Sequence, residues 1–99
     1  MKCRHCNINL ATEQHHVIFK SQRGSNDPCN IINLCQSCHF AIHHGNNTKL
    51  RKEVLTTCYD YIRHNLDKVQ KPGTKIPDWK LAHIEQGNYE FIFEKMGLI

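Results

Sequence analysis

Two matched pairs of cysteines are the residues of this sequence best suited to binding a metal ion. Cys3 and Cys6 form one Cys-x2-Cys pair, and Cys35 and Cys38 form the other. Each pair can hold two thiolates on one side of a tetrahedral ion, so the two pairs together would make a closed, structural zinc site. The alternative, a set of buried free thiols, is common for single cysteines but explains two matched pairs poorly.

Two other motifs share these residues, and neither fits as well. The run from Cys35 to His39 matches the C-x-x-C-H pattern of covalent haem attachment, but that chemistry follows export and we see no export signal. A finger with two cysteines and two histidines needs about 12 residues between its Cys and His pairs, whereas His39 directly follows Cys38. Of the remaining cysteines, Cys58 is expected in the core and Cys29 as a filler where a strand begins.

Four histidines are spaced so that they could share a second metal site. His39 and His43 are four residues apart, so on a helix they project from one face and can grip a single cation. His15 and His16 are adjacent at the start of a predicted strand, where neighbouring residues face opposite sides. One of them can therefore face the metal while the other has a different task, such as activating a water. Chance clustering of surface histidines is the alternative.

The elements that must position these residues are short. The apolar runs at residues 17–19 and 31–32 predict two strands of a hairpin, and the polar loop at residues 21–28 predicts its long tip. A helix is expected from about Gln36, and Gly45 is well placed to end it. The 28 residues between the cysteine pairs, positions 7 to 34, are more than a simple zinc ribbon has, so this hairpin is expected between them.

After Gly45 the spacing of apolar residues becomes helical. Apolar residues recur here at intervals of four, which predicts an amphipathic helix that continues to Val69. They are Leu50, Val54, Cys58, Ile62 and Leu66. Residues 71–73 break it, and a further helical stretch is expected from residues 77–78 onward. We therefore expect a core over residues 1–45 and a helical extension over residues 46–99, packed on that core in a single domain. The extension could also bind DNA or pair two subunits in a homodimer, but its apolar face needs burial.

Composition sets the frame for these sites. The chain has 99 residues, 39% of them apolar and 22% charged, which is typical of one small globular domain. We expect no membrane segment, because no window approaches the roughly 18 consecutive apolar residues that a span needs, and we expect a cytoplasmic location. In that reducing compartment six cysteines favour metal binding over disulfides. The net charge of +4 favours a polyanionic partner.

With these residues in view, the sequence resembles the HNH endonucleases, a family with a ββα-metal fold. The resemblance covers residues 3–45, and the runs that carry it are His15-His16-Val17, Gly24-Ser25-Asn26-Asp27, residues 30–39 and His43. It implies a small, zinc-stabilised α+β fold with a ββα-metal core and additional C-terminal helices.

The resemblance also implies a role for each histidine. In the family the first residue of the leading pair binds the catalytic metal and the second is the general base, which implies these roles for His15 and His16. The last histidine of the motif corresponds to His39, a second metal ligand. The further ligand His43 follows the pattern of the nuclease toxins within the family.

A supporting asparagine and a reaction follow from the same resemblance. The family asparagine lies five residues before the third cysteine, which selects Asn30 over Asn33. The implied activity is a metal-dependent DNA endonuclease with one catalytic metal and products that carry 5′-phosphate and 3′-hydroxyl ends. The small size of the chain leads us to expect a phage or bacterial origin. The catalytic ion is Mg, Mn, Ni or Zn, and ligation by imidazoles alone favours the transition metals.

Basic residues near the motif could bind the DNA backbone. They are Lys20, Arg23, Lys49, Arg51 and Lys52. Contacts of this kind give affinity without sequence choice, and the alternative for each residue is a solvated surface charge. The alternative function is a zinc-stabilised nucleic-acid-binding module without catalysis.

Overall fold

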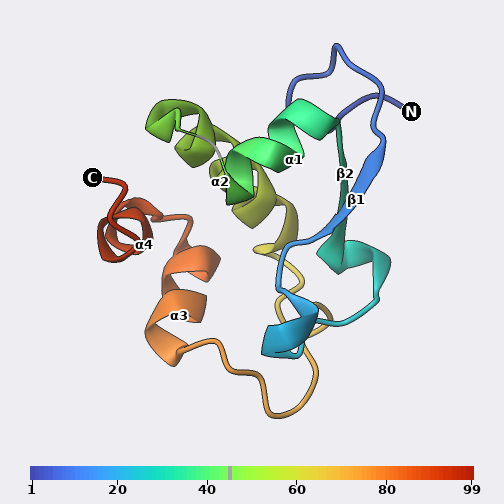
Figure 1. Cartoon of the computed structure of the whole chain (residues 1–99). Helices are drawn as coiled ribbons and strands as arrows, with labels where there is room; N and C mark the ends of the chain where they lie inside the picture. Colours follow the sequence, from blue (N-terminus) through green and yellow to red (C-terminus); the bar gives the residue numbers. More distant parts are fainter. Residues whose placement is uncertain (45) are drawn as a thin grey trace.

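A hairpin followed by four helices forms the small α+β structure (Figure 1), which a computed structural model describes for residues 1–44 and 46–99. The elements in order are β1 (Glu13–His16), the 3₁₀ turns η1 (Lys20–Gln22) and η2 (Pro28–Asn30), β2 (Ile31–Leu34), α1 (Gln36–His43), α2 (Thr48–Ile62), α3 (Asp78–Gln86) and α4 (Glu90–Lys95). This confirms the predicted fold class. Gly45, expected to end the first helix, lies outside the described residues. None of the described helices is long and apolar enough to cross a membrane.

The hairpin is antiparallel, and its first strand lies earlier than the sequence predicted. β1 pairs with β2 so that His15 lies opposite Ile32 and His16 opposite Ile31. The strand predicted at residues 17–19 is wrong, because the ladder ends at the buried side chain of Asn30. The Val17 N–H still reaches the backbone oxygen of Asn30, but the Ile18 N–H donates to Asn30 Oδ1, at 2.8 Å. The chain then turns away into η1.

The long amphipathic helix α2 begins as expected and ends early. The Asn47 side chain accepts a hydrogen bond from the Leu50 N–H, at 3.0 Å, and so caps the N-terminus. The prediction that the helix continues past Leu66 to Val69 is wrong, since α2 ends at Ile62. Residues 63–70 instead form turns that lead to the hairpin tip, where the Ser25 N–H donates to the Val69 oxygen and Gly24 pairs with Gln70. These long-range pairings replace helical ones.

The C-terminal stretch forms two helices, α3 and α4. α3 starts after Pro77, and Gly87, with a φ of 72°, ends it in the left-handed conformation that glycine adopts without strain. One core cluster joins buried side chains from the hairpin, α1, α2 and α4, among them Ile32, Leu34, Ile42, Val54, Ile62 and Ile92. Cys58 is fully buried in this cluster, as predicted, and burial raises the pKa of its thiol to about 12.

Candidate metal centres

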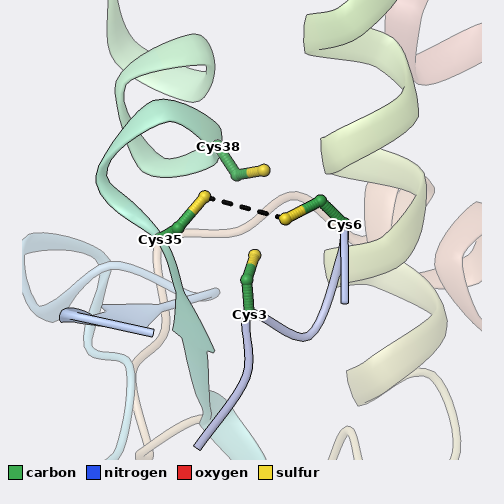
Figure 2. A group of neighbouring side chains, drawn as sticks. All are labelled: Cys3, Cys6, Cys35 and Cys38. Atoms are coloured by element: carbon green, nitrogen blue, oxygen red, sulfur yellow. Dashed lines mark hydrogen bonds between the residues drawn. The ribbon is translucent and has the colours of Figure 1, made fainter. Parts of the chain in front are cut away.

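The two cysteine pairs meet at one point, as Figure 2 shows. The sulfur atoms of Cys3, Cys6, Cys35 and Cys38 all lie within 4.8 Å of one another, and Cys6 Sγ is 3.9 Å from Cys35 Sγ. A tetrahedral zinc site with Zn–S bonds of about 2.3 Å would place its sulfurs about 3.8 Å apart. The four cysteines are therefore close enough together to form a metal site.

Local backbone geometry explains how the first pair converges. Asn7 has a φ of 58°, a left-handed conformation that asparagine tolerates better than most residues, and its N–H donates to the Cys3 oxygen. The chain closes again where the Cys3 N–H donates to the Asn9 oxygen, at 2.8 Å. The Asn9 side-chain amide lies 3.7 Å from Cys35 Sγ and so joins the two pairs. This contact of Asn9 could not be predicted from the spacing of the cysteines.

The environment favours thiolates at three of the four positions. Backbone N–H groups of Asn9 and Ile8 lower the pKa of Cys6. Burial raises the pKa values of Cys3 and Cys35, but hydrogen bonds from neighbouring backbone N–H groups and other donors outweigh it and leave both lowered. Burial, followed by hydrogen bonds with Cys35 and Cys3, raises the pKa of Cys38. A cation bound among the sulfurs would reverse this last shift, because a coordinated thiol is deprotonated.

Three of the predicted histidines form a second cluster. His15 comes from β1, while His39 and His43 come from α1, and their ligand nitrogens all lie within 4.8 Å of one another. The ring centroids are 5.0 to 5.4 Å apart. His15 is only 5% exposed, and burial, followed by the charges of His39 and His43, lowers its pKa to about 4. Near neutral pH His15 is therefore the neutral imidazole that a metal requires.

His16 is not a member of this cluster. It is half-buried, and its Nε2 lies 3.0 Å from Asn26 Oδ1 in the hairpin tip. An imidazole that donates its Nε2–H to this oxygen keeps a lone pair on Nδ1. Asn26 belongs to the run that carries the resemblance, but its contact with His16 could not be read from the sequence because the loop folds back onto β1.

Asn30 fastens the loop that follows His16. Its side chain is fully buried, with Oδ1 accepting from the Ile18 N–H and Nδ2 donating to the oxygens of Ile18 and Ser25, at 3.0 and 2.9 Å. Asn33, the other candidate, makes no side-chain hydrogen bond within residues 1–44 and 46–99. This one amide thus joins the two ends of the loop that follows His16, at Ile18 and Ser25.

Of the five predicted basic residues, one lines the cavity beside the histidine cluster. Arg51 lines a cavity beside His15 and His43, whereas Lys20, Lys49 and Lys52 do not line it. Arg23 does not line it either, and its Nε donates a hydrogen bond to the Pro72 oxygen, at 2.8 Å.

Comparison with known proteins gives a match over the segment that holds both clusters. Residues 3–45 match a family model described as HNH endonuclease. A curated protein named Anaredoxin, from Nostoc sp., is 40% identical over 45 residues, which cover 44% of this chain and 59% of the relative. The aligned part thus spans about three-fifths of that protein's length. No solved structure matched the chain. The resemblance predicted from the cysteine pairs and the histidines is confirmed: residues 3–45 are similar to the HNH endonucleases.

Proposed function

We propose that this chain is a metal-dependent DNA endonuclease. The observation that carries the proposal is the convergence of His15, His39 and His43 beside His16, within the segment that matches HNH endonucleases. The four-cysteine site would hold structural zinc and stabilise the residues around it. In this proposal residues 1–45 are the nuclease core and residues 46–99 are an extension of the same domain.

The three clustered imidazoles fit a catalytic divalent cation. They are spaced for one ion, one of them is deeply buried, and a lowered pKa keeps His15 unprotonated. Imidazole ligands suit Zn, Ni or Mn better than Mg. When bound, the cation supplies neutralisation of the phosphate charge and support for the departing 3′-oxygen.

His16 is the general base of the proposed reaction. With its Nε2–H donated to Asn26, its Nδ1 can accept a proton from a water molecule. That water attacks the phosphorus in line with the 3′-oxygen, and the bond between phosphorus and this oxygen breaks. The 3′-oxygen takes a proton from solvent, so the products carry a 5′-phosphate and a 3′-hydroxyl. A neutral imidazole can accept this proton and so act as a general base. Asn30 supports the loop and takes no part in proton transfer.

A plasmid assay tests the proposal. Purified protein is incubated with supercoiled DNA and Mg, Mn, Ni or Zn. The control is a parallel incubation to which EDTA is added in excess for a short time. We expect nicked or linear products with at least one ion, none with EDTA, and ends that a DNA ligase can rejoin. The alternative, a non-catalytic nucleic-acid-binding module, predicts retarded DNA in a gel shift and no cleavage with any of the four ions.

A further inference from the structure

A cationic cavity adjoins the histidine cluster. It has a volume of about 190 Å³, and its walls include His15 and His43, with Arg51 from α2 and Lys80 from α3. Ligand pockets usually span about 300 to 1,000 Å³. This cavity is therefore sized for one chemical group of a larger ligand.

Two positive charges line this cavity without a carboxylate. No Asp or Glu lines it among the residues that the structure describes. Arg51 is half-buried, and its Nε is shielded from solvent and has no hydrogen-bond partner within those residues. The Lys80 Nζ lies 5.8 Å from the centroid of the Tyr59 ring, a buried side chain on the same cavity wall. The cavity is thus short of one anionic partner.

An anionic ligand in the cavity would lower the free energy of the two cations. A buried cation is costly unless it is paired, and two like charges in one small cavity also repel each other. Burial already lowers the pKa of Lys80. An anion that entered the cavity would accept hydrogen bonds from both side chains, and such charge-assisted bonds are the strong ones. A guanidinium and an ammonium together suit a phosphate.

We propose that Arg51 and Lys80 together bind one backbone phosphate of the DNA, next to the phosphate that is cut at the cluster of His15, His39 and His43. The proposal rests on the proposed nuclease function for the identity of the ligand. Both cations lie outside residues 3–45, so the C-terminal helices would complete the substrate site of the HNH-like segment. Arg51 was expected to meet DNA from the sequence, whereas Lys80 was not.

The test measures DNA binding apart from cleavage. Arg51→Gln, Lys80→Gln and the double variant are made in the His16→Ala background, so that a labelled DNA duplex stays intact. The control is Lys95→Gln, which removes an exposed cation that lies beside Phe91 and does not line the cavity. Zinc content and far-UV circular dichroism verify that each variant is folded.

We expect each single variant to weaken DNA binding about tenfold, because a hydrogen bond to a charged group is lost. The dependence of affinity on salt should also become less steep. Because both cations hold the same phosphate, the double variant should lose less than the product of the two single losses.

Two results would overturn this inference. One is that the cavity variants bind DNA as tightly as Lys95→Gln. The other is that the two losses multiply in full, which would assign the residues to separate phosphates. If the wild-type protein cuts plasmid DNA but the variants bind normally, only this inference fails. If the losses occur as expected but no ion supports cleavage, only the nuclease proposal fails.

Discussion

At the scale of single residues, His15 and His16 have different surroundings although they are neighbours in sequence. His15 is buried among His39, His43 and Phe19, whereas His16 Nε2 lies 3.0 Å from Asn26 Oδ1 in the hairpin tip. The alternation of a strand explains this division, because successive side chains point to opposite faces. Substitutions of His15 and of His16 should therefore have different effects on metal binding and on cleavage.

Replacing the base should remove cleavage and leave metal binding intact. We expect His16→Ala to lose about 10²- to 10⁴-fold in cleavage rate, the usual contribution of a positioned general base. Metal affinity, measured by calorimetry, should hardly change. His39→Ala should weaken both. A His16→Ala protein that loses the catalytic metal, while His15→Ala keeps it, would show that the two roles are reversed.

The contact between Asn26 and His16 makes a separate prediction about pH. In Asn26→Asp a carboxylate would face the imidazole and favour its protonated form. Because only the neutral imidazole accepts the proton, the rise of the cleavage rate with pH should move to higher pH. Asn26→Ala should lower the rate without that upward move. Rate profiles at saturating metal measure this, and identical profiles for wild type and Asn26→Asp would contradict the contact.

Buried His15 links pH to stability in protein without a catalytic metal. Its pKa falls from 6.5 to about 4 on folding, so the unfolded chain binds the extra proton between these values. The stability that neutral His15 contributes is thus present above about pH 6.5 and is lost as pH falls toward 4, by ~3 kcal/mol in total. Imidazole NMR titration should give a pKa below 5 for His15. A value near 6.5 would contradict its burial.

At the scale of elements, the buried Asn30 amide joins the start of the hairpin loop to its tip. Asn30→Ala would leave the Ile18 N–H and the oxygens of Ile18 and Ser25 without their partner. Each unsatisfied buried group costs about 1 to 3 kcal/mol. We expect a clearly lower thermal midpoint and faster amide hydrogen exchange in residues 17–25. Asn33→Ala is the matched control, and an equal loss there would contradict the assignment of Asn30.

The same hairpin shows which features could be predicted from sequence. Cys-x2-Cys spacing and the i, i+4 spacing of His39 and His43 are local geometry, so both clusters could be predicted. The position of β1 could not be predicted. The apolar residues 17–19 have the pattern of a strand, but the Asn30 side chain binds the Ile18 N–H and ends the strand pairing before them. The end of α2 likewise depends on pairing of residues 69–71 with the hairpin tip. Lys80 reaches the site through tertiary packing alone.

At the scale of the whole molecule, the four-cysteine site connects distant parts of the chain. His5, between the cysteines of the first pair, has its Nδ1 2.8 Å from Thr57 Oγ1 of α2, and the Arg4 guanidinium lies 5.3 Å from the centroid of the Tyr61 ring. The second cysteine pair leads directly into α1, where His39 follows Cys38. A zinc ion bound by both pairs would therefore hold the hairpin, α1 and α2 together.

Removing that ion should affect both metal sites. A domain of this size gains much of its folding free energy from a structural metal, so Cys3→Ser should lose the one tightly held zinc and melt at a much lower temperature. Since α1 carries His39 and His43, loosening its first turn should also weaken binding of the catalytic metal. Cys29→Ser, a half-buried thiol outside the cluster, is the control and should keep its zinc. Elemental analysis and thermal melts measure the effect. If purified wild-type protein contains no zinc or holds iron in its place, or if Cys3→Ser is as stable as Cys29→Ser, the proposed zinc site is wrong.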